Sequence, residues 1–123
     1  MPSGKPSEAS VVAEVRLAWS NTGNRIFRNN VGQLYDRDGR IVRYGLCVGS
    51  SDLIGWRKVT ITPDMVGQTI AQFAALECKR KGGQPTGQQV RFLKVVEEAG
   101  GIAAIVTSAD EALALLEGLK AQG

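Results

Sequence analysis

Glu77 and Lys79 are the first side chains in this sequence whose types and spacing could do chemistry together. They lie at the end of an apolar segment, residues 70–79, that is typical of a strand. Since successive side chains of a strand point to opposite faces, Glu77 and Lys79 share a face and Cys78 points the other way. A carboxylate and an ammonium group that project together can hold a cation and activate a water beside it. The ordinary alternative is an exposed ion pair at a sheet edge.

Two other carboxylates could complete a metal site. Asp52 stands in a turn of small residues, Gly49-Ser50-Ser51-Asp52, where an aspartate commonly caps backbone N–H groups instead. Glu8 begins a helix, where its charge also interacts favourably with the helix dipole. Glu14 is the rival in that helix, but it lies off the apolar stripe, so we favour Glu8. Together with Glu77, these carboxylates are the hard oxygen ligands that Mg²⁺ or Mn²⁺ prefers.

The composition excludes several other chemistries. The chain of 123 residues contains no histidine, which rules out His-based triads, His general bases and zinc sites that use imidazole. Cys47 and Cys78 form no CxxC pair, and we expect both to pack as small apolar residues. The run Asp36-x-Asp38-Gly39 resembles the start of a calcium loop, but Cys47 occupies the position that requires glutamate. A hairpin turn is predicted there instead.

The sequence predicts neither a membrane segment nor a leader. The longest apolar runs, such as residues 102–106, are far too short to span a bilayer. Residues 1–7 contain two prolines and no apolar stretch, so we expect no signal peptide. We therefore expect a cytoplasmic protein of a bacterium or of a phage-infected host cell. Residues 1–6 are expected to form a flexible tail, and residues 7–123 a single domain.

The elements that must position these side chains follow from periodicity and caps. A helix is predicted from Ser7, with apolar residues at helical spacing on one face, and it ends by Asn21-Thr22-Gly23. A short helix begins at Thr62-Pro63-Asp64 and stops at Gly67. Strands are predicted at residues 25–29, 40–48, 52–61 and 70–79.

The last part of the chain carries the clearest helix signals. The capping box Thr86-x-x-Gln89 opens a helix that stops at Gly100-Gly101. A buried strand at residues 102–107 follows, and a second capping box, Ser108-x-x-Glu111, opens the final helix. We predict an α/β fold with the core order α-β-β-β-α-β-α, in which helices flank a mixed central sheet.

Several motifs stand in a characteristic order along the chain. They are Ser7-Glu8 at a helix start, Phe27-Arg28-Asn29-Asn30-Val31-Gly32, Gly49-x-x-Asp52-Leu53-Ile54-Gly55, Phe73-Ala74-Ala75-Leu76-Glu77-Cys78-Lys79 and Gln89-x-x-Phe92. In order and spacing they resemble the virus-type replication-repair nuclease (VRR-NUC) domain, a branch of the PD-(D/E)xK nuclease superfamily. The resemblance covers residues 7–108 and implies a restriction-endonuclease-like core. Ser51 departs from the proline of the superfamily name, and Cys78 from a branched apolar residue.

The resemblance implies roles for individual residues. Lys79 would position or activate the attacking water. Gln89 matches a glutamine that the family carries close to the active site. Its position in the capping box gives it a structural role that can hold at the same time. The metal ligands would be Glu8, Asp52, Glu77 and the backbone carbonyl of Cys78.

Basic residues give a weak indication of a polyanionic partner. The net charge is +3, and positive side chains gather in the first half of the chain and again after Glu77. Phosphate contacts would account for them, whereas a solvated sheet edge is the ordinary alternative. We expect DNA contacts from Arg25, Arg28, Asn30, Arg80 and Lys81.

We therefore interpret the sequence as a Mg²⁺- or Mn²⁺-dependent endonuclease that hydrolyses DNA phosphodiesters, with a place in DNA repair. By resemblance it would act as a homodimer on four-way (Holliday) junctions. Flaps, nicks or free ends are alternative substrates, and a non-catalytic DNA-binding module is the alternative of another class. The dimer interface would use residues 102–106 and Ala112, Leu113, Leu115, Leu116 and Leu119. The alternative is that these residues only cover the sheet of their own subunit.

Overall fold

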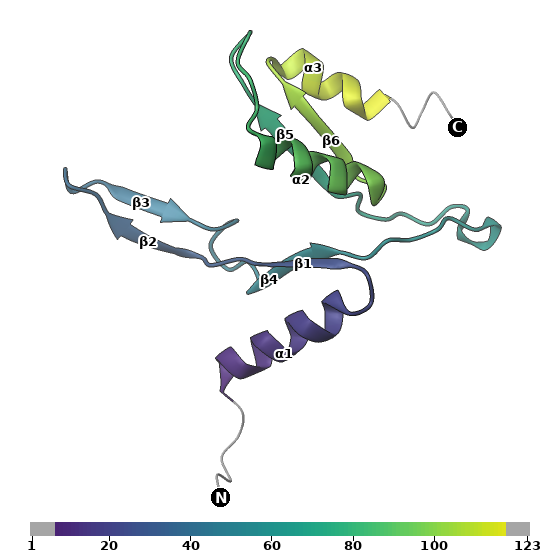
Figure 1. Cartoon of the computed structure of the whole chain (residues 1–123), viewed down its shortest axis with the longest axis horizontal. Coiled ribbons are helices and arrows are strands. Elements are labelled where there is room, and N and C mark those ends of the chain that lie inside the picture. The colour runs from purple at the N-terminus through teal and green to yellow at the C-terminus, as the bar shows by residue number, and fades with distance from the viewer. Residues whose placement is uncertain (1–6, 118–123) are drawn as a thin grey trace, which may run out of the picture. The chain divides into compact units, whose positions relative to one another are not determined.

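The structure is a computed structural model, and it describes residues 7–117. The predicted tail at residues 1–6 and the end of the final helix, with Leu119, lie outside the described residues. The chain divides between Val59 and Thr60 into two units, and each contains both helix and strand, which confirms the α/β class (Figure 1). No helix within the described part of the chain is long and apolar enough to cross a membrane. A single domain over residues 7–123 stays a prediction.

The first helix, α1 (Glu8–Ser20), begins and ends where the sequence predicts. Ser7 is the N-cap, and its side chain accepts a hydrogen bond of 3.1 Å from the backbone N–H of Ser10. The apolar stripe is less buried than the periodicity predicts. Trp19 is half-buried, but Val11 is 45% exposed, as a surface residue would be.

Trp19 joins α1 to the first sheet of the first unit. This sheet pairs β1 (Arg25–Arg28) with β4 (Leu53–Trp56) in antiparallel register. The indole Nε1 of Trp19 donates hydrogen bonds to the backbone oxygens of Arg25, at 3.1 Å, and Trp56, at 3.3 Å, one on each strand. Both predicted strands therefore exist, but they are shorter than the apolar pattern indicates.

The second sheet of the first unit is a hairpin that the sequence predicted only in part. Strand β3 (Ile41–Tyr44) was expected, but β2 (Gly32–Tyr35), its antiparallel partner, was not. Gly32 lies opposite Tyr44, and a Cβ at Gly32 would collide with the Tyr44 phenol. Glycine therefore weakens the strand signal at the very position where the ring needs the space.

The turn of this hairpin is as predicted. The Asp36 side chain accepts hydrogen bonds of 2.9 Å from the backbone N–H groups of Asp38 and Arg40. Gly39 takes a φ of 78°, which favours glycine. Asp36 thus closes the predicted hairpin turn.

The second unit is built around a parallel β-α-β arrangement. After a single 3₁₀ turn, η1 (Pro63–Met65), strand β5 (Ala74–Cys78) runs parallel to β6 (Ile102–Val106), and α2 (Gly87–Glu98) connects them. The helix predicted after Thr62 is therefore only a 3₁₀ turn. Helix α2 contacts both strands.

Both ends of α2 follow the local signals in the sequence. The capping box at Thr86 is complete. At the other end, Gly100 takes a φ of 96° and donates to the Glu97 oxygen, while Gly101 donates to the Val96 oxygen, both at 2.9 Å. These two bonds form a Schellman motif. Val96, 1% exposed, is the most buried side chain of the described residues.

The sheet arrangement differs from the prediction. Within residues 7–117 the strands form three two-stranded sheets, β1-β4, β2-β3 and β5-β6, where the sequence predicted one mixed central sheet. The element order also differs from α-β-β-β-α-β-α. Five strands, β1 to β5, lie between α1 and α2, where the predicted order has three. Pairing depends on contacts between distant segments, which hydrophobic patterning does not specify.

The last described helix, α3 (Ala109–Ala114), is capped by Ser108, whose side chain accepts from the Glu111 N–H at 3.1 Å. The predicted capping box is only half correct. The Glu111 carboxylate accepts its hydrogen bonds from the hydroxyl and the backbone N–H of Thr107, one residue before the cap. The Thr107 side-chain hydrogen bond, followed by the Thr107 backbone hydrogen bond, lowers the pKa of Glu111 below its usual 4.5.

This shift predicts a pH-dependent contribution to stability. A lowered pKa means that the folded chain holds the charged carboxylate, so the contribution is present above the unfolded value of 4.5 and is lost as the pH falls through the folded value. We expect Glu111→Gln to lower the free energy of unfolding near neutral pH, with a difference from wild type that vanishes in acid. Urea unfolding at several pH values measures it. Ser108→Ala is the control, because it should cost about 1 kcal/mol at every pH.

Candidate functional site

Glu77 and Lys79 lie together at the end of β5. Lys79 follows the strand directly, and its Nζ atom is 3.4 Å from Oε1 of Glu77. The two side chains are only 28% and 22% exposed, while Cys78 between them is exposed. The strand alternation that the sequence predicts is therefore correct. The pair is half-buried, which distinguishes it from the ordinary ion pair at a solvated edge.

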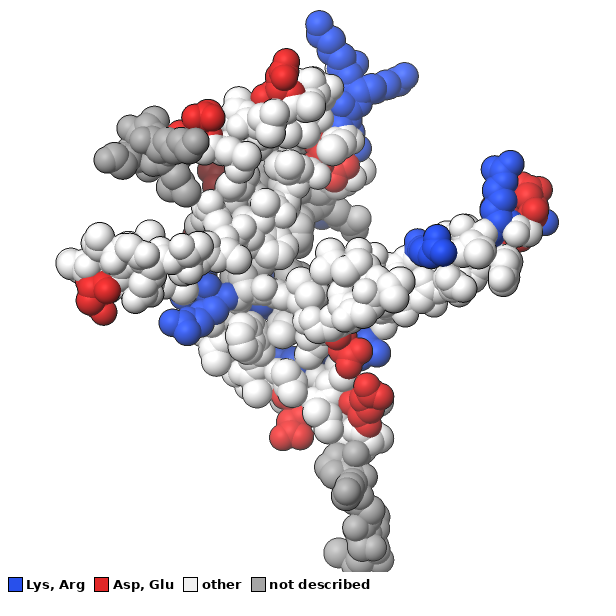
Figure 2. Space-filling model, turned by 180° about the vertical axis from the view of Figure 1, so that it is seen from behind, with Lys and Arg blue, Asp and Glu red and all other residues white. Residues whose placement is uncertain are grey.

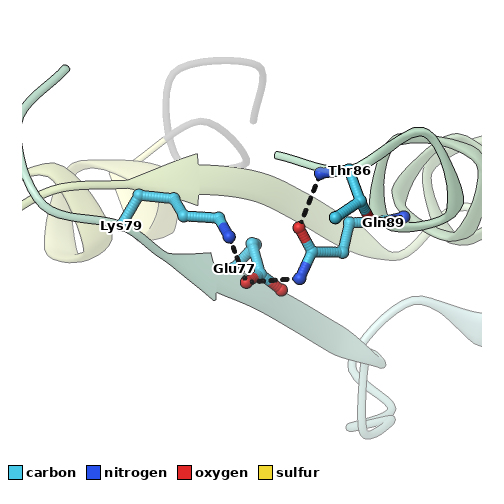
Figure 3. Close-up of polar contacts among 4 residues, drawn as sticks. All are labelled: Glu77, Lys79, Thr86 and Gln89. Atoms are coloured by element: carbon cyan, nitrogen blue, oxygen red, sulfur yellow. Dashed lines mark hydrogen bonds and ion pairs between the residues drawn. The ribbon is translucent and has the colours of Figure 1, made fainter. Parts of the chain in front are cut away.

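Gln89, on the first turn of α2, contacts the same carboxylate. Its Nε2 atom donates a hydrogen bond of 3.0 Å to Oε1 of Glu77 (Figure 3). Its Oε1 atom accepts from the Thr86 backbone N–H at 2.9 Å, and its own N–H donates to the Thr86 hydroxyl at 3.1 Å. The capping role and the role beside Glu77 thus coexist. Because the cap occupies the amide oxygen, the amide nitrogen is the atom presented to Glu77.

The two contacts leave half of the Glu77 carboxylate for a further ligand. Oε1 receives both the Lys79 ammonium and the Gln89 amide. Within residues 7–117, Oε2 takes part in no hydrogen bond or ion pair. A carboxylate oxygen on a partly buried side chain is a suitable ligand for Mg²⁺ or Mn²⁺. Lys79 is not such a ligand while it carries its proton.

The first unit holds a pocket that brings together three of the predicted residues. Arg28, Asn30 and Asp52 all line it, and its volume is about 440 Å³. The Arg28 Nε atom donates a hydrogen bond of 2.8 Å to the Asn30 side-chain oxygen, which orients the guanidinium group. The pocket therefore combines a cation with an exposed carboxylate. The remaining lining residues are Asn29, Val31, Tyr44 and Ser50.

Asp52 does not have the capping role that its turn suggested. Its carboxylate accepts no hydrogen bond and forms no ion pair within the described residues. Its backbone oxygen accepts from the Asn29 N–H at 2.8 Å. The side chain is exposed, so the carboxylate is available to a ligand.

Glu8 is the remaining side chain among the predicted metal ligands. Glu8 and its rival Glu14 are both exposed on α1, and nothing in the structure decides between them. Asp52 belongs to the first unit and Glu77 to the second. In the described part of the chain no three Asp, Glu or Cys residues stand close enough together to hold a metal ion. The complete ligand set, with the Cys78 carbonyl, stays a prediction.

Cys47 and Cys78 were expected to pack as small apolar residues, and this was wrong. Both are exposed free thiols. Cys47 lies in a bend after β3. For Cys78, apolar neighbours do not ensure burial, because alternate residues of a strand face opposite ways. Cys78 is the exposed residue between Glu77 and Lys79, which are half-buried.

The basic residues predicted to contact DNA are exposed. Arg25 and Arg28 stand at the two ends of β1, and Arg80 and Lys81 follow Lys79 in a turn. Figure 2 shows Lys and Arg side chains (blue) in small groups, several of them beside Asp and Glu side chains (red). Their role toward phosphate stays a prediction.

Asn29 is a residue that sequence reasoning missed. It lies within one of the family motifs, and its half-buried side chain makes three hydrogen bonds to residues 46–51. An asparagine directly after a strand was the one available signal. Its partners lie 17 to 22 residues away, so local patterning could not identify them.

Comparison with known protein families gives one match. The family model of the VRR-NUC domain matches residues 8–110, which is most of the chain. The matched range contains β5, the start of α2 and the pocket at Asp52. No curated protein and no solved structure shows a significant match.

Proposed function

We propose, since this chain belongs to the VRR-NUC domain family over residues 8–110, that it is a metal-dependent endonuclease that hydrolyses DNA phosphodiesters. Family membership indicates nuclease activity in general. The observation that carries the proposal is the half-buried Glu77 carboxylate, which is shared by Lys79 and Gln89 through one oxygen. The Gln89 amide, whose oxygen is held by the helix cap, fixes the position of this carboxylate oxygen.

The chain's own residues have distinct parts in this proposal. Glu77, Asp52 and Glu8 would supply carboxylate oxygens to Mg²⁺ or Mn²⁺, with the Cys78 carbonyl as a further ligand. A cation held there would supply positive charge to the scissile phosphate and would lower the pKa of a water bound to it. Lys79 holds its ammonium group beside Glu77, where it orients the attacking water and offsets charge on the phosphate. Gln89 keeps Glu77 in place.

The first unit is suited to holding the DNA backbone. Arg28 lines the same pocket as Asp52, and its orientation is set by Asn30. An oriented guanidinium group can bind a phosphate through two parallel hydrogen bonds. Such contacts position DNA without reading its sequence. We assign the same role to Arg25, Arg80 and Lys81.

We also propose a restriction-endonuclease-like core, which membership of the family implies. The β5-α2-β6 arrangement, with Glu77 on one strand, supports it. A crystal structure of the protein with Ca²⁺ in place of Mg²⁺ tests both the core and the ligand set. Asp52 and Glu77 on one cation are the expected result.

A cleavage assay separates the proposal from its rivals. Linear, flap, nicked and four-way DNA are incubated with Mg²⁺, with Mn²⁺ and with EDTA. We expect cleavage with either metal and none with EDTA. Binding to DNA without cleavage under all conditions would favour a non-catalytic module. Cleavage of flaps, nicks or free ends in preference to junctions would favour the alternative substrates.

A homodimer that prefers four-way junctions is the specific prediction. Symmetric resolution of a junction requires two cuts in opposed strands, and a two-fold dimer supplies two sites through one interface. On α3 and the turn that follows it, Ala112 and Leu115 are half-buried, whereas Leu113 and Leu116 are 60% and 58% exposed. The helix thus covers its own sheet with one side and leaves apolar surface on the other.

Light scattering at micromolar concentration measures the mass, and competition between junction and linear duplex measures the preference. We expect Leu116→Glu to produce a monomer that loses the junction preference. Val66→Glu is the matched control, because Val66 is 86% exposed in the same unit and lies outside both α3 and the turn that follows it. A wild-type monomer that cuts linear duplex equally well would refute the junction assignment but not the nuclease assignment.

A further inference from the structure

Asn29 ties the loop that carries Asp52 to strand β1, and we propose that it is the positioning residue for the Asp52 carboxylate. The inference rests on the proposed function, because it concerns the cation that Asp52 would bind. Asn29 itself contacts no metal or DNA in this proposal. It acts by fixing the backbone from which the Asp52 side chain projects.

The backbone of Asn29 extends the β1-β4 pairing by one step. The last pair of the ladder is Arg28 opposite Leu53. Beyond it, the Asn29 N–H donates a hydrogen bond of 2.8 Å to the Asp52 oxygen. Asp52 therefore stands at the first position outside the strand and is held there directly by Asn29.

The side chain of Asn29 uses every kind of polar group that an amide offers. Its Nδ2 atom donates to the Ser50 hydroxyl and to the Ser51 backbone oxygen, both at 2.8 Å. Its Oδ1 atom accepts from the Leu46 N–H at 2.9 Å. Only an amide can donate twice and accept once in this way. Asparagine is therefore specifically required, and a carboxylate of the same shape would not replace it.

The loop has internal bonds, but these do not attach it to β1. The Ser50 hydroxyl donates to the Cys47 oxygen at 2.6 Å, and the Ser50 N–H donates to the same oxygen at 3.0 Å. These bonds close a local turn in which Gly49 takes a φ of 85°. The three Asn29 bonds connect this turn to the strand. Ser50 and Asn29 both line the pocket with Asp52.

The orientation of the Asp52 carboxylate depends on this connection. In the described part of the chain, the carboxylate has no hydrogen bond or ion pair of its own. Asn29 therefore acts on this carboxylate through the backbone position from which the side chain projects. Residues that orient a metal ligand commonly change metal affinity by about 10- to 100-fold when they are removed.

The test uses Mn²⁺ affinity of the full chain, measured by isothermal titration, together with the dependence of cleavage rate on Mn²⁺ concentration. We expect Asn29→Ala to weaken Mn²⁺ binding by about 10- to 100-fold. The rate at saturating Mn²⁺ should recover most of the wild-type value, because the ligand itself is still present. Ser50→Ala should shift affinity in the same direction by less, since it removes a single partner of Asn29.

Asn24→Ala is the matched control. Asn24 is also a half-buried amide of the first unit, with its Oδ1 atom accepting from the Lys58 N–H at 2.8 Å and its Nδ2 atom donating to the Thr22 hydroxyl at 3.0 Å. It does not line the pocket. We expect unchanged Mn²⁺ affinity for this variant. Circular dichroism shows which variants are folded, and Ser50→Ala carries the test if Asn29→Ala does not fold.

Each outcome has a distinct meaning. Weakened affinity in Asn29→Ala or Ser50→Ala, with Asn24→Ala unchanged, supports the inference. Unchanged affinity in folded Asn29→Ala overturns it, and so does an equal loss in Asn24→Ala, which would indicate general destabilisation. A folded wild-type chain that neither binds Mn²⁺ nor cleaves DNA would overturn the proposed function, and the Asn29 inference with it.

Discussion

Replacement of Glu77 by glutamine is expected to abolish DNA cleavage while the chain stays folded. Glutamine has the same shape and can still accept the hydrogen bond from Gln89. It lacks the negative charge that a divalent cation requires and that Lys79 faces at 3.4 Å. We expect a loss of at least about 100-fold in single-turnover rate, since a bound cation contributes several kcal/mol to the transition state. Asp52→Asn is expected to have an effect of the same order.

The controls replace carboxylates that are exposed and outside both sites. Glu98→Gln lies on α2 of the second unit, and Asp38→Asn lies in the hairpin turn of the first. Both should cleave at the wild-type rate. Circular dichroism compares the folds, and a nicking assay compares the rates. Wild-type cleavage by either Glu77→Gln or Asp52→Asn would remove that residue from the proposed ligand set.

Lys79→Ala is expected to reduce turnover by about 100-fold or more with little loss of metal affinity. A protonated lysine cannot coordinate a cation, so its contribution should arise in the transition state, where it meets the charge that develops on the phosphate. Its removal also frees Oε1 of Glu77 from a competing positive charge. Mn²⁺ affinity should therefore be equal to that of the wild type or slightly higher.

Isothermal titration with Mn²⁺ and single-turnover kinetics at saturating Mn²⁺ separate the two effects. Lys94→Ala, an exposed lysine on α2, is the control and should retain both affinity and rate. A Lys79→Ala variant that loses Mn²⁺ affinity but keeps its rate at saturation would reverse the assigned roles. Lys79 would then act by organising the ligands rather than in the chemical step.

The ends of the helices could be predicted from the sequence because their causes are local. Ser7 caps α1, Thr86 forms a complete capping box, and Gly100 allows the Schellman motif. Each of these features involves residues within about one turn of one another. Ser108-x-x-Glu111 shows how far such signals reach. The Ser108 cap forms as predicted, but the Glu111 carboxylate accepts a hydrogen bond from Thr107, one residue before the cap.

Strands were predicted less well because a strand requires a partner. The pattern located β1, β3, β4, β5 and β6 but extended most of them beyond their paired residues. Strand β2 was not predicted, because it begins with Gly32, a residue that is rare in strands. The small size of Gly32 makes room for Tyr44 on the opposite strand. The division into three two-stranded sheets likewise depends on which segments meet.

The sequence by itself determined the chemistry available to this protein. The absence of histidine left carboxylates, lysines, tyrosines, serines or a bound hard cation as the means of catalysis. The period of a strand placed Glu77 and Lys79 on one face. The motif order identified the family that the comparison confirms. These conclusions need only residue types and short-range geometry.

Only the tertiary structure decided how those side chains are held. It showed that Gln89 caps α2 with its oxygen and contacts Glu77 with its nitrogen, 12 residues distant. It also showed that Asn29 secures the loop before Asp52, across 17 to 22 residues. A hydrogen bond between distant segments forms only when the folded chain brings a donor within about 3 Å of an acceptor at the correct angle. Patterning along the chain contains no information on such distances, because it records only which neighbours share a face.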